Sequence, residues 1–159
     1  MLKYRRLHVR ELESLEQKFI QFLVSNTITG DDWLKIKTQQ PERAEGLIEI
    51  FSNLVFDEAL KKVNYLKLGS KNDLKIFRFG ESFIQLLGLA VNHPSKEIDF
   101  YKQHDLAEIV RTNEHLSIYH LEKKYAISKE HDAFFLMEQG CLICDGSDFE
   151  ILELLYQMR

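Results

Sequence analysis

The spacing of apolar residues changes about halfway along this chain, and this change constrains the fold more than any other feature. Up to about residue 66, apolar residues recur every three or four positions, which is the period of an amphipathic helix. Two β-rich runs follow, Leu74–Phe79 and Phe83–Val91. The pattern predicts an α+β fold with N-terminal helices, a small antiparallel sheet containing a central hairpin, and C-terminal helices.

Three helices are predicted before the sheet. The first covers residues 9–24, where Leu12, Leu15, Phe19, Phe22 and Leu23 would form one apolar face. The second begins after Thr29, which starts a capping-box pattern. The third begins at Pro41, a residue favoured at the first position of a helix, and runs towards Leu66, with Gly69 as its C-terminal cap.

The sheet and the C-terminal helices are predicted from residue 74 onwards. The short Gly80–Ser82 break predicts a hairpin, and its second run is apolar on both faces, which favours a central, covered strand. A weak helix is predicted over 105–112 and a third strand over 116–125. Ser128 would cap a helix that ends at Gly140, and a capping box at 147–150 would begin a last helix over 148–158. With no linker in the sequence, we expect a single domain over residues 1–159.

Two cysteines, Cys141 and Cys144, stand three positions apart and follow a histidine-rich middle part of the chain. A Cys-x-x-Cys pair can be half of a zinc site or a redox pair, and Leu142 and Ile143 between the thiols favour a third reading, in which the cysteines pack as small hydrophobic residues. The alternative is a metal or acid–base site that combines these cysteines with histidines; its candidates are His93, His115 and His120. We expect no cofactor.

Charge is unevenly distributed along the chain. The net charge of −4 argues against a generic nucleic-acid binder. A basic N-terminal arm nevertheless contrasts with an acidic region over residues 129–159, and the two could pair within one chain or between two. Aromatic residues interleaved with basic ones make a nucleic-acid surface the third hypothesis; its candidate residues are Tyr4, Arg5, Arg6, Lys61, Lys62 and Arg78.

No nucleophile elbow and no glycine-rich phosphate loop occurs in the sequence. The leading hypothesis is therefore a non-enzymatic protein–protein interaction domain, with a homodimer formed through its long amphipathic helices as one form of that interaction. A metal-binding or thiol-dependent enzyme is the alternative. Charged and polar residues follow the first basic cluster directly, and no apolar stretch reaches the roughly 18 residues of a membrane span, so we expect a cytoplasmic protein with no membrane contact.

Several segments together resemble a single-domain protein family of Bacteroidota to which no function is assigned. The resemblance covers nearly the whole chain and transfers no activity, ligand or site residue. It rests on Lys3–Leu7, Phe22-Leu23, Ile28–Trp33, Pro41-Glu42, Leu47–Ser52, Val63–Leu66, Ile84–Gly88 and Glu138–Cys141.

Overall fold

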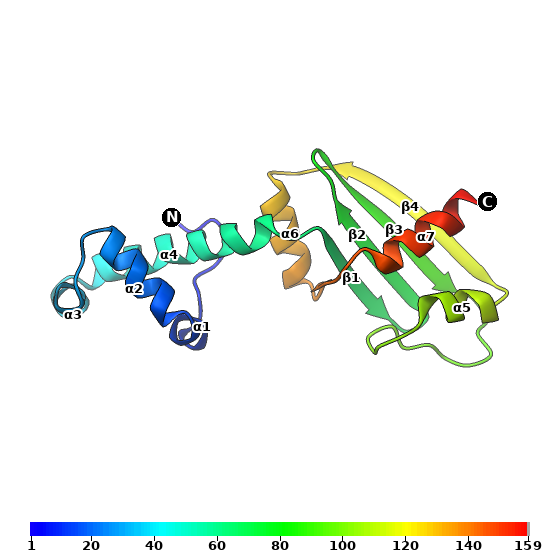
Figure 1. Cartoon of the computed structure of the whole chain (residues 1–159), viewed down its shortest axis with the longest axis horizontal. Coiled ribbons are helices and arrows are strands. Elements are labelled where there is room, and N and C mark those ends of the chain that lie inside the picture. Colours follow the sequence, from blue (N-terminus) through cyan, green and yellow to red (C-terminus); the bar gives the residue numbers. More distant parts are fainter. Residues whose placement is uncertain (159) are drawn as a thin grey trace. The chain divides into compact units, whose positions relative to one another are not determined.

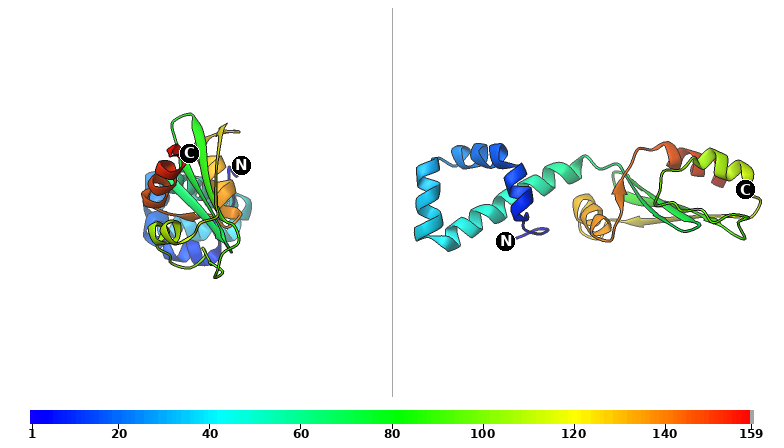
Figure 2. Two further views of the ribbon diagram at one scale, coloured as in Figure 1. Left: turned by 90° about the vertical axis from the view of Figure 1, so that its right-hand side faces the viewer. Right: turned by 90° about the horizontal axis from the view of Figure 1, so that it is seen from below.

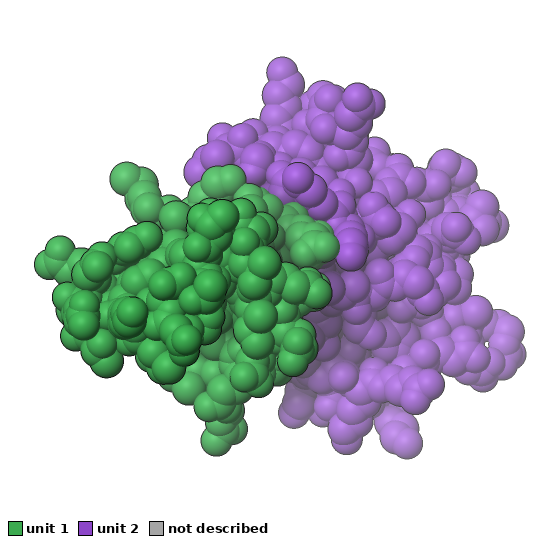
Figure 3. Space-filling view, turned by 60° about the vertical axis from the view of Figure 1, so that its left-hand side comes forward, with its two compact units in different colours: residues 1–59 green, residues 60–159 purple. Residues whose placement is uncertain are grey.

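The computed structural model describes residues 1–158 and divides into two compact units, residues 1–59 and residues 60–159 (Figure 3). The described residues form seven α-helices and a five-stranded antiparallel sheet (Figure 1), which confirms the α+β fold. The single domain over residues 1–159 stays a prediction. No helix within residues 1–158 is both long enough and apolar enough to cross a membrane.

The first unit is a helical cluster built around aromatic side chains. It contains α1 (Val9–Ser14), α2 (Glu16–Ser25), α3 (Gly30–Gln39) and most of α4 (Pro41–Lys61). The ring of Phe19 lies 5.1 Å from that of Trp33 and 5.0 Å from that of Phe51, measured between centroids. Such aromatic pairs add about 0.5–1.5 kcal/mol each beyond their area burial, so this cluster stabilises the unit.

The predicted continuous helix over residues 9–24 is wrong, because the chain turns at Leu15 between α1 and α2. Leu15 has φ −106° and ψ 19°, and its amide hydrogen bond is shared between the carbonyls of Glu11 and Leu12. The turn lets Leu12 of α1 and Phe19 of α2 pack against the same buried cluster. The helix start after Thr29 is confirmed: Thr29 Oγ1 accepts from the Asp32 amide at 3.1 Å, and the Asp32 carboxylate accepts from the Thr29 amide at 3.0 Å.

The third predicted helix begins at Pro41 as expected but ends at Lys61, not near Leu66. Residues Tyr65–Ser70 form β1 instead, and Leu66 is fully buried opposite Phe77 of the next strand. Gly69 is therefore a strand residue and not a helix cap. A β-carbon there would lie 2.1 Å from the carbonyl oxygen of Phe100, so only glycine allows this close backbone approach.

The strands follow the order β4-β3-β2-β1-β5, and all pairs are antiparallel. The predicted hairpin is confirmed as β2 (Asp73–Phe79) and β3 (Phe83–Val91), and the predicted third strand as β4 (Leu116–Lys124). β5 (Leu142–Ile143) was not predicted, because two residues carry too little pattern to be recognised.

The two edges of the sheet differ. At the β1 edge, β5 pairs with Leu66 and Lys67, and further along the Phe100 amide donates to the Ser70 carbonyl at 3.0 Å. Short segments therefore cover the edge of β1 near both of its ends. At the opposite edge, β4 pairs over nine residues with β3 and with no other strand of the part that the structure describes.

Helices cover one face of the sheet. In Figure 2, α5 (Leu106–Thr112) and α7 (Ser147–Gln157) lie along one face, while α6 (Lys129–Glu138) lies at one end of the strands. The helices predicted over 105–112, after Ser128 and over 148–158 are thus confirmed. The core between the covered face and α7 contains Leu74, Ile76, Leu87, Leu89, Val91, Ile118, Phe149 and Leu152.

The predicted capping box of the last helix is wrong. Gly146 is the N-cap of α7, and Ser147 is its first helical residue. The amide and the hydroxyl of Ser147 both donate to the Asp145 carboxylate, at 3.0 and 2.5 Å. Asp145 thus forms the local turn that aspartate favours. Ser147 lies one position inside the helix, so its hydroxyl does not occupy the capping position.

Candidate functional site

The second face of the sheet carries apolar side chains that α5 and α7 do not cover. Successive strand residues point to opposite faces, so Leu74 and Ile76 of β2 face α7 while Phe77 faces the other way. By strand register, Leu86 of β3 and Leu121 of β4 lie on the same side as Phe77. We call this side the open face.

An apolar groove of about 720 Å³ lies where the open face meets α6 and the loop before it. Such a volume is within the range of about 300–1,000 Å³ that is usual for binding sites. Nine of its thirteen lining residues are apolar, and four are ionisable. The lining consists of Phe77, Ile84, Leu86, Leu121, Glu122, Lys123, Ala126, Ile127, His131, Asp132, Phe134, Phe135 and Leu136.

The rim of the groove is unusually apolar for a surface. Leu121, Ile127 and Phe135 are 64%, 76% and 62% exposed. Lys123 lies beside them, and its side-chain ammonium forms no hydrogen bond or ion pair with another described residue. The groove therefore offers water-exposed apolar area together with one cation that the described residues do not neutralise.

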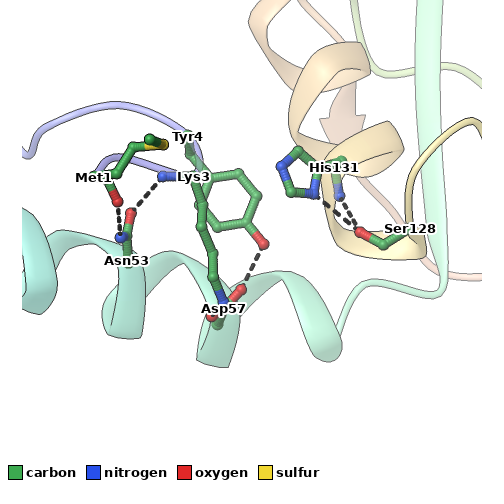
Figure 4. Close-up of polar contacts among 7 residues, drawn as sticks. All are labelled: Met1, Lys3, Tyr4, Asn53, Asp57, Ser128 and His131. Atoms are coloured by element: carbon green, nitrogen blue, oxygen red, sulfur yellow. Dashed lines mark hydrogen bonds and ion pairs between the residues drawn. The ribbon is translucent and has the colours of Figure 1, made fainter.

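Two of the ionisable residues in the groove help to hold its wall in place. The buried Asp132 carboxylate accepts a hydrogen bond from the Ala126 amide at 3.0 Å, which fixes the loop to α6. The Ser128 hydroxyl accepts from the His131 amide at 3.1 Å as the N-cap of α6, and His131 Nδ1 lies 3.1 Å from the same oxygen (Figure 4). These contacts define the wall of the groove before any ligand enters.

Away from the groove, the open face carries a polar cluster. The ring of Tyr119 lies over Gly88, and its hydroxyl donates to the Asp73 carboxylate at 3.0 Å. Lys75 pairs with the same carboxylate at 2.5 Å. Burial is the largest cause that raises the pKa of Tyr119 above its usual value, so this phenol stays protonated as a donor.

The cysteines occupy the interior and its margin. Cys141 is buried, and Cys144 is half-buried against the main core of the sheet. Burial raises the pKa of both thiols, that of Cys144 to about 11. Because the thiolate is the reactive and metal-binding form, these environments suit packing residues better than nucleophiles or ligands.

The structure does not assemble the candidate histidines into one centre. The His93 and His115 rings are 6.1 Å apart, near the ends of β3 and β4, whereas His120 lies against Tyr156 of α7 at 5.4 Å. Within residues 1–158, no group of three or more His, Cys, Asp or Glu side chains is placed to hold a metal ion. The metal and thiol candidates thus lie in separate places.

The candidate basic residues of the N-terminal arm are engaged within the helical unit. Arg5 forms two hydrogen bonds of 2.9 Å with the Glu11 carboxylate, and Arg6 pairs with Glu45. The Tyr4 hydroxyl donates to Asp57 on α4 at 2.5 Å (Figure 4). These acidic partners reduce the positive charge that the arm could offer to phosphate.

The remaining basic candidates lie in the second unit, on separate elements. Arg78 lies with its guanidinium carbon 4.5 Å from the centre of the Phe149 ring and hydrogen-bonds Gln85, so it belongs to the covered face of the sheet. Lys61 and Lys62 are exposed at and just after the end of α4, and the Lys61 carbonyl accepts from Lys129 Nζ at 3.0 Å.

Sequence reasoning missed the groove. One signal in the sequence pointed to it, because both faces of the 83–91 run are apolar. We expected a strand covered on both faces. The strand, β3, does lie between β2 and β4, but α7 and α5 cover only one of its faces. The Ile84 and Leu86 side chains on its second face line the groove. The sequence could not show that the helices would leave this face open.

The chain belongs to DUF6495, a family of unknown function whose model matches residues 1–157. The resemblance to a family without an assigned function is thereby confirmed. No curated protein and no solved structure matches the chain. No relative of known activity therefore indicates a function, and the groove is the feature that does.

Proposed function

We propose that this protein is a non-enzymatic interaction domain whose groove binds an amphipathic helical segment of a partner protein. The observation that carries the proposal is the groove between the open face and α6, with its apolar lining and exposed rim. Amphipathic helices bind proteins by laying an apolar stripe into such a groove. We also propose that the protein acts in the cytoplasm, where two free thiols would remain reduced.

A protein segment fits the rim better than a small ligand does. A small molecule within the groove would leave most of Leu121, Ile127 and Phe135 in water, since these side chains stand more than half exposed. A helix lying along the groove would cover them and gain the free energy of burying that apolar area. Lys123 at the rim favours an acidic residue beside the apolar stripe of the partner.

The test uses a fluorescein-labelled synthetic helix with leucines at helical spacing and glutamates elsewhere, titrated with the full-length protein and followed by fluorescence anisotropy. We expect saturable binding that Phe135→Asp abolishes and Lys123→Glu weakens. Leu154→Asp is the matched control, because Leu154 on α7 is equally exposed (63%) but lies outside the groove lining. A second peptide with lysines in place of the glutamates should bind more weakly.

Two results would contradict the proposal. One is peptide binding that Phe135→Asp leaves unchanged, which would place the contact elsewhere. The other is saturable binding of dodecanoate without binding of either peptide, which would assign the groove to a small apolar ligand.

A further inference from the structure

We infer that β4 is the interface for a second copy of this chain, with two β4 strands pairing antiparallel around Leu121. This inference concerns the edge of the sheet and does not depend on what the groove binds. It differs from the dimer that the sequence suggested, in which long helices would pair. In the structure Phe51 of α4 is buried in the cluster of its own unit, and Leu47 packs against that cluster.

The first observation is that the β4 edge is open. β4 pairs with β3 over its full length, and no other described strand lies beyond it. Residues 121–124 are all exposed, so this end of β4, which leads into the loop before α6, is accessible within its unit. An exposed edge strand presents unpaired backbone groups that a further strand can bind.

The second observation is charge complementarity, which favours one register over its neighbours. Opposite residues of an antiparallel pair lie on the same face, so a symmetric pair of β4 strands must be centred on a residue. Centring on Leu121 sets His120 opposite Glu122 of the second copy and Tyr119 opposite Lys123. Each pair forms twice: the first offers a histidine–carboxylate hydrogen bond, and the second a cation over an aromatic ring.

Neighbouring registers are less favourable. Centring on Glu122 or on Lys123 would place that residue opposite its own copy, and like charges directly opposite each other destabilise a strand pair. Centring on His120 would set two histidines opposite each other and would place Glu122 opposite the buried Ile118. The register around Leu121 avoids both problems.

The second copy would also complete the groove. Leu121 lies on the open face and lines the groove at its outer side, where it is largely exposed. In the proposed register the second copy brings its own Leu121 directly opposite, with Cα atoms about 4.5–5.5 Å apart. The two side chains would contact each other at this outer side, and the outer walls of two grooves would become continuous.

The test is site-specific disulfide formation in the full-length chain. Two Cα atoms about 4.5–5.5 Å apart suit a disulfide, so Leu121→Cys should give a covalent dimer under mild oxidation. Lys123→Cys is the control: in this register its two copies are offset by four residues, or about 13 Å, which is too far for a disulfide. Wild-type protein shows whether Cys141 and Cys144 contribute any cross-link of their own.

Light scattering coupled to size exclusion gives an independent readout. We expect the wild type and Leu154→Asp to be dimers, and Leu121→Asp to be a monomer with an unchanged circular dichroism spectrum. A wild-type monomer at every concentration tested would overturn the inference. So would a Lys123→Cys variant that cross-links as fast as Leu121→Cys. A monomeric wild type or fast cross-linking of Lys123→Cys would say nothing about peptide binding in the groove or its loss in Phe135→Asp. The dimer through β4 and the peptide-binding groove can therefore be refuted separately.

Discussion

Replacing Gly88 by alanine tests the packing of the open face most directly. Gly88 of β3 lies opposite Tyr119 of β4, whose ring lies over it. A β-carbon at position 88 would lie 1.9 Å from Cζ of that ring. The added methyl group must therefore displace the ring, and with it the 3.0 Å hydrogen bond from the Tyr119 hydroxyl to Asp73.

The size of the effect follows from three contributions to the free energy of unfolding. Overpacking costs about 1–3 kcal/mol. Loss of the hydrogen bond costs about 0.5–1.5 kcal/mol. Replacing glycine in a strand returns about 0.5–1 kcal/mol because the unfolded chain loses less entropy. We expect Gly88→Ala to destabilise the sheet unit by about 2 kcal/mol, which lowers the Tm of a domain of this size by roughly 10 °C.

The same substitution should change sign when the ring is absent. A Tyr119→Ala background removes the three atoms nearest to the new methyl group, so Gly88→Ala should there stabilise the unit by about 0.5–1 kcal/mol. The interaction energy of the double-mutant cycle should therefore be about 2–3 kcal/mol. This sign reversal distinguishes obstruction by the ring from a general intolerance of β3 to substitution.

Thermal unfolding followed by far-UV circular dichroism measures all four proteins of the cycle. Trp33, the single tryptophan of the chain, lies in α3 and reports separately on the helical unit through its fluorescence. The reasoning is refuted if Gly88→Ala destabilises both backgrounds equally, because the ring would then not be the obstacle.

Two further predictions concern titratable groups. Burial raises the pKa of Cys144 to about 11. Its alkylation by iodoacetamide at pH 8 should therefore be about a hundredfold slower than that of a thiol with the ordinary pKa of 9.0, and unfolding in urea should abolish the difference. Fast alkylation of Cys144 in the folded protein would contradict its burial. The hydrogen bond from Arg5, followed by the bond from the His8 amide, lowers the pKa of Glu11 from 4.5 to about 2. Because the folded-state pKa is the lower one, this contribution to stability is present above pH 4.5 and is lost as the pH falls towards 2. We expect the loss of stability not to exceed about 1 kcal/mol, since the Arg5–Glu11 pair is partly exposed. Urea unfolding followed by Trp33 fluorescence measures this loss, which should be absent in Glu11→Gln. An equal pH dependence in the wild type and in Glu11→Gln would refute the prediction.

Local chemistry made much of the fold predictable. The Thr29 cap and Pro41 set two helix starts within a residue or two, because capping and a fixed φ act through neighbouring residues alone. The short glycine-containing break likewise predicted the β2–β3 hairpin. These features need no knowledge of the rest of the chain.

The errors arose where distant contacts override local pattern. Leu66 continues a helical spacing, but its pairing with Phe77 places it in a strand. The turn at Leu15 serves packing against a shared cluster, which no spacing reveals. The groove was missed for the same reason, because the open face of the sheet depends on where α5 and α7 pack.

The short segments that cover the β1 edge limit how many chains can associate through their sheets. A sheet with two open edges can recruit copies at both sides and grow into a fibre. Here β5 and the segment around Phe100 occupy the β1 edge, so association through β4 consumes the remaining long edge and growth stops at two chains. Deleting the β5 segment would expose part of the β1 edge, and we would then expect the protein to form aggregates in which sheet pairs with sheet.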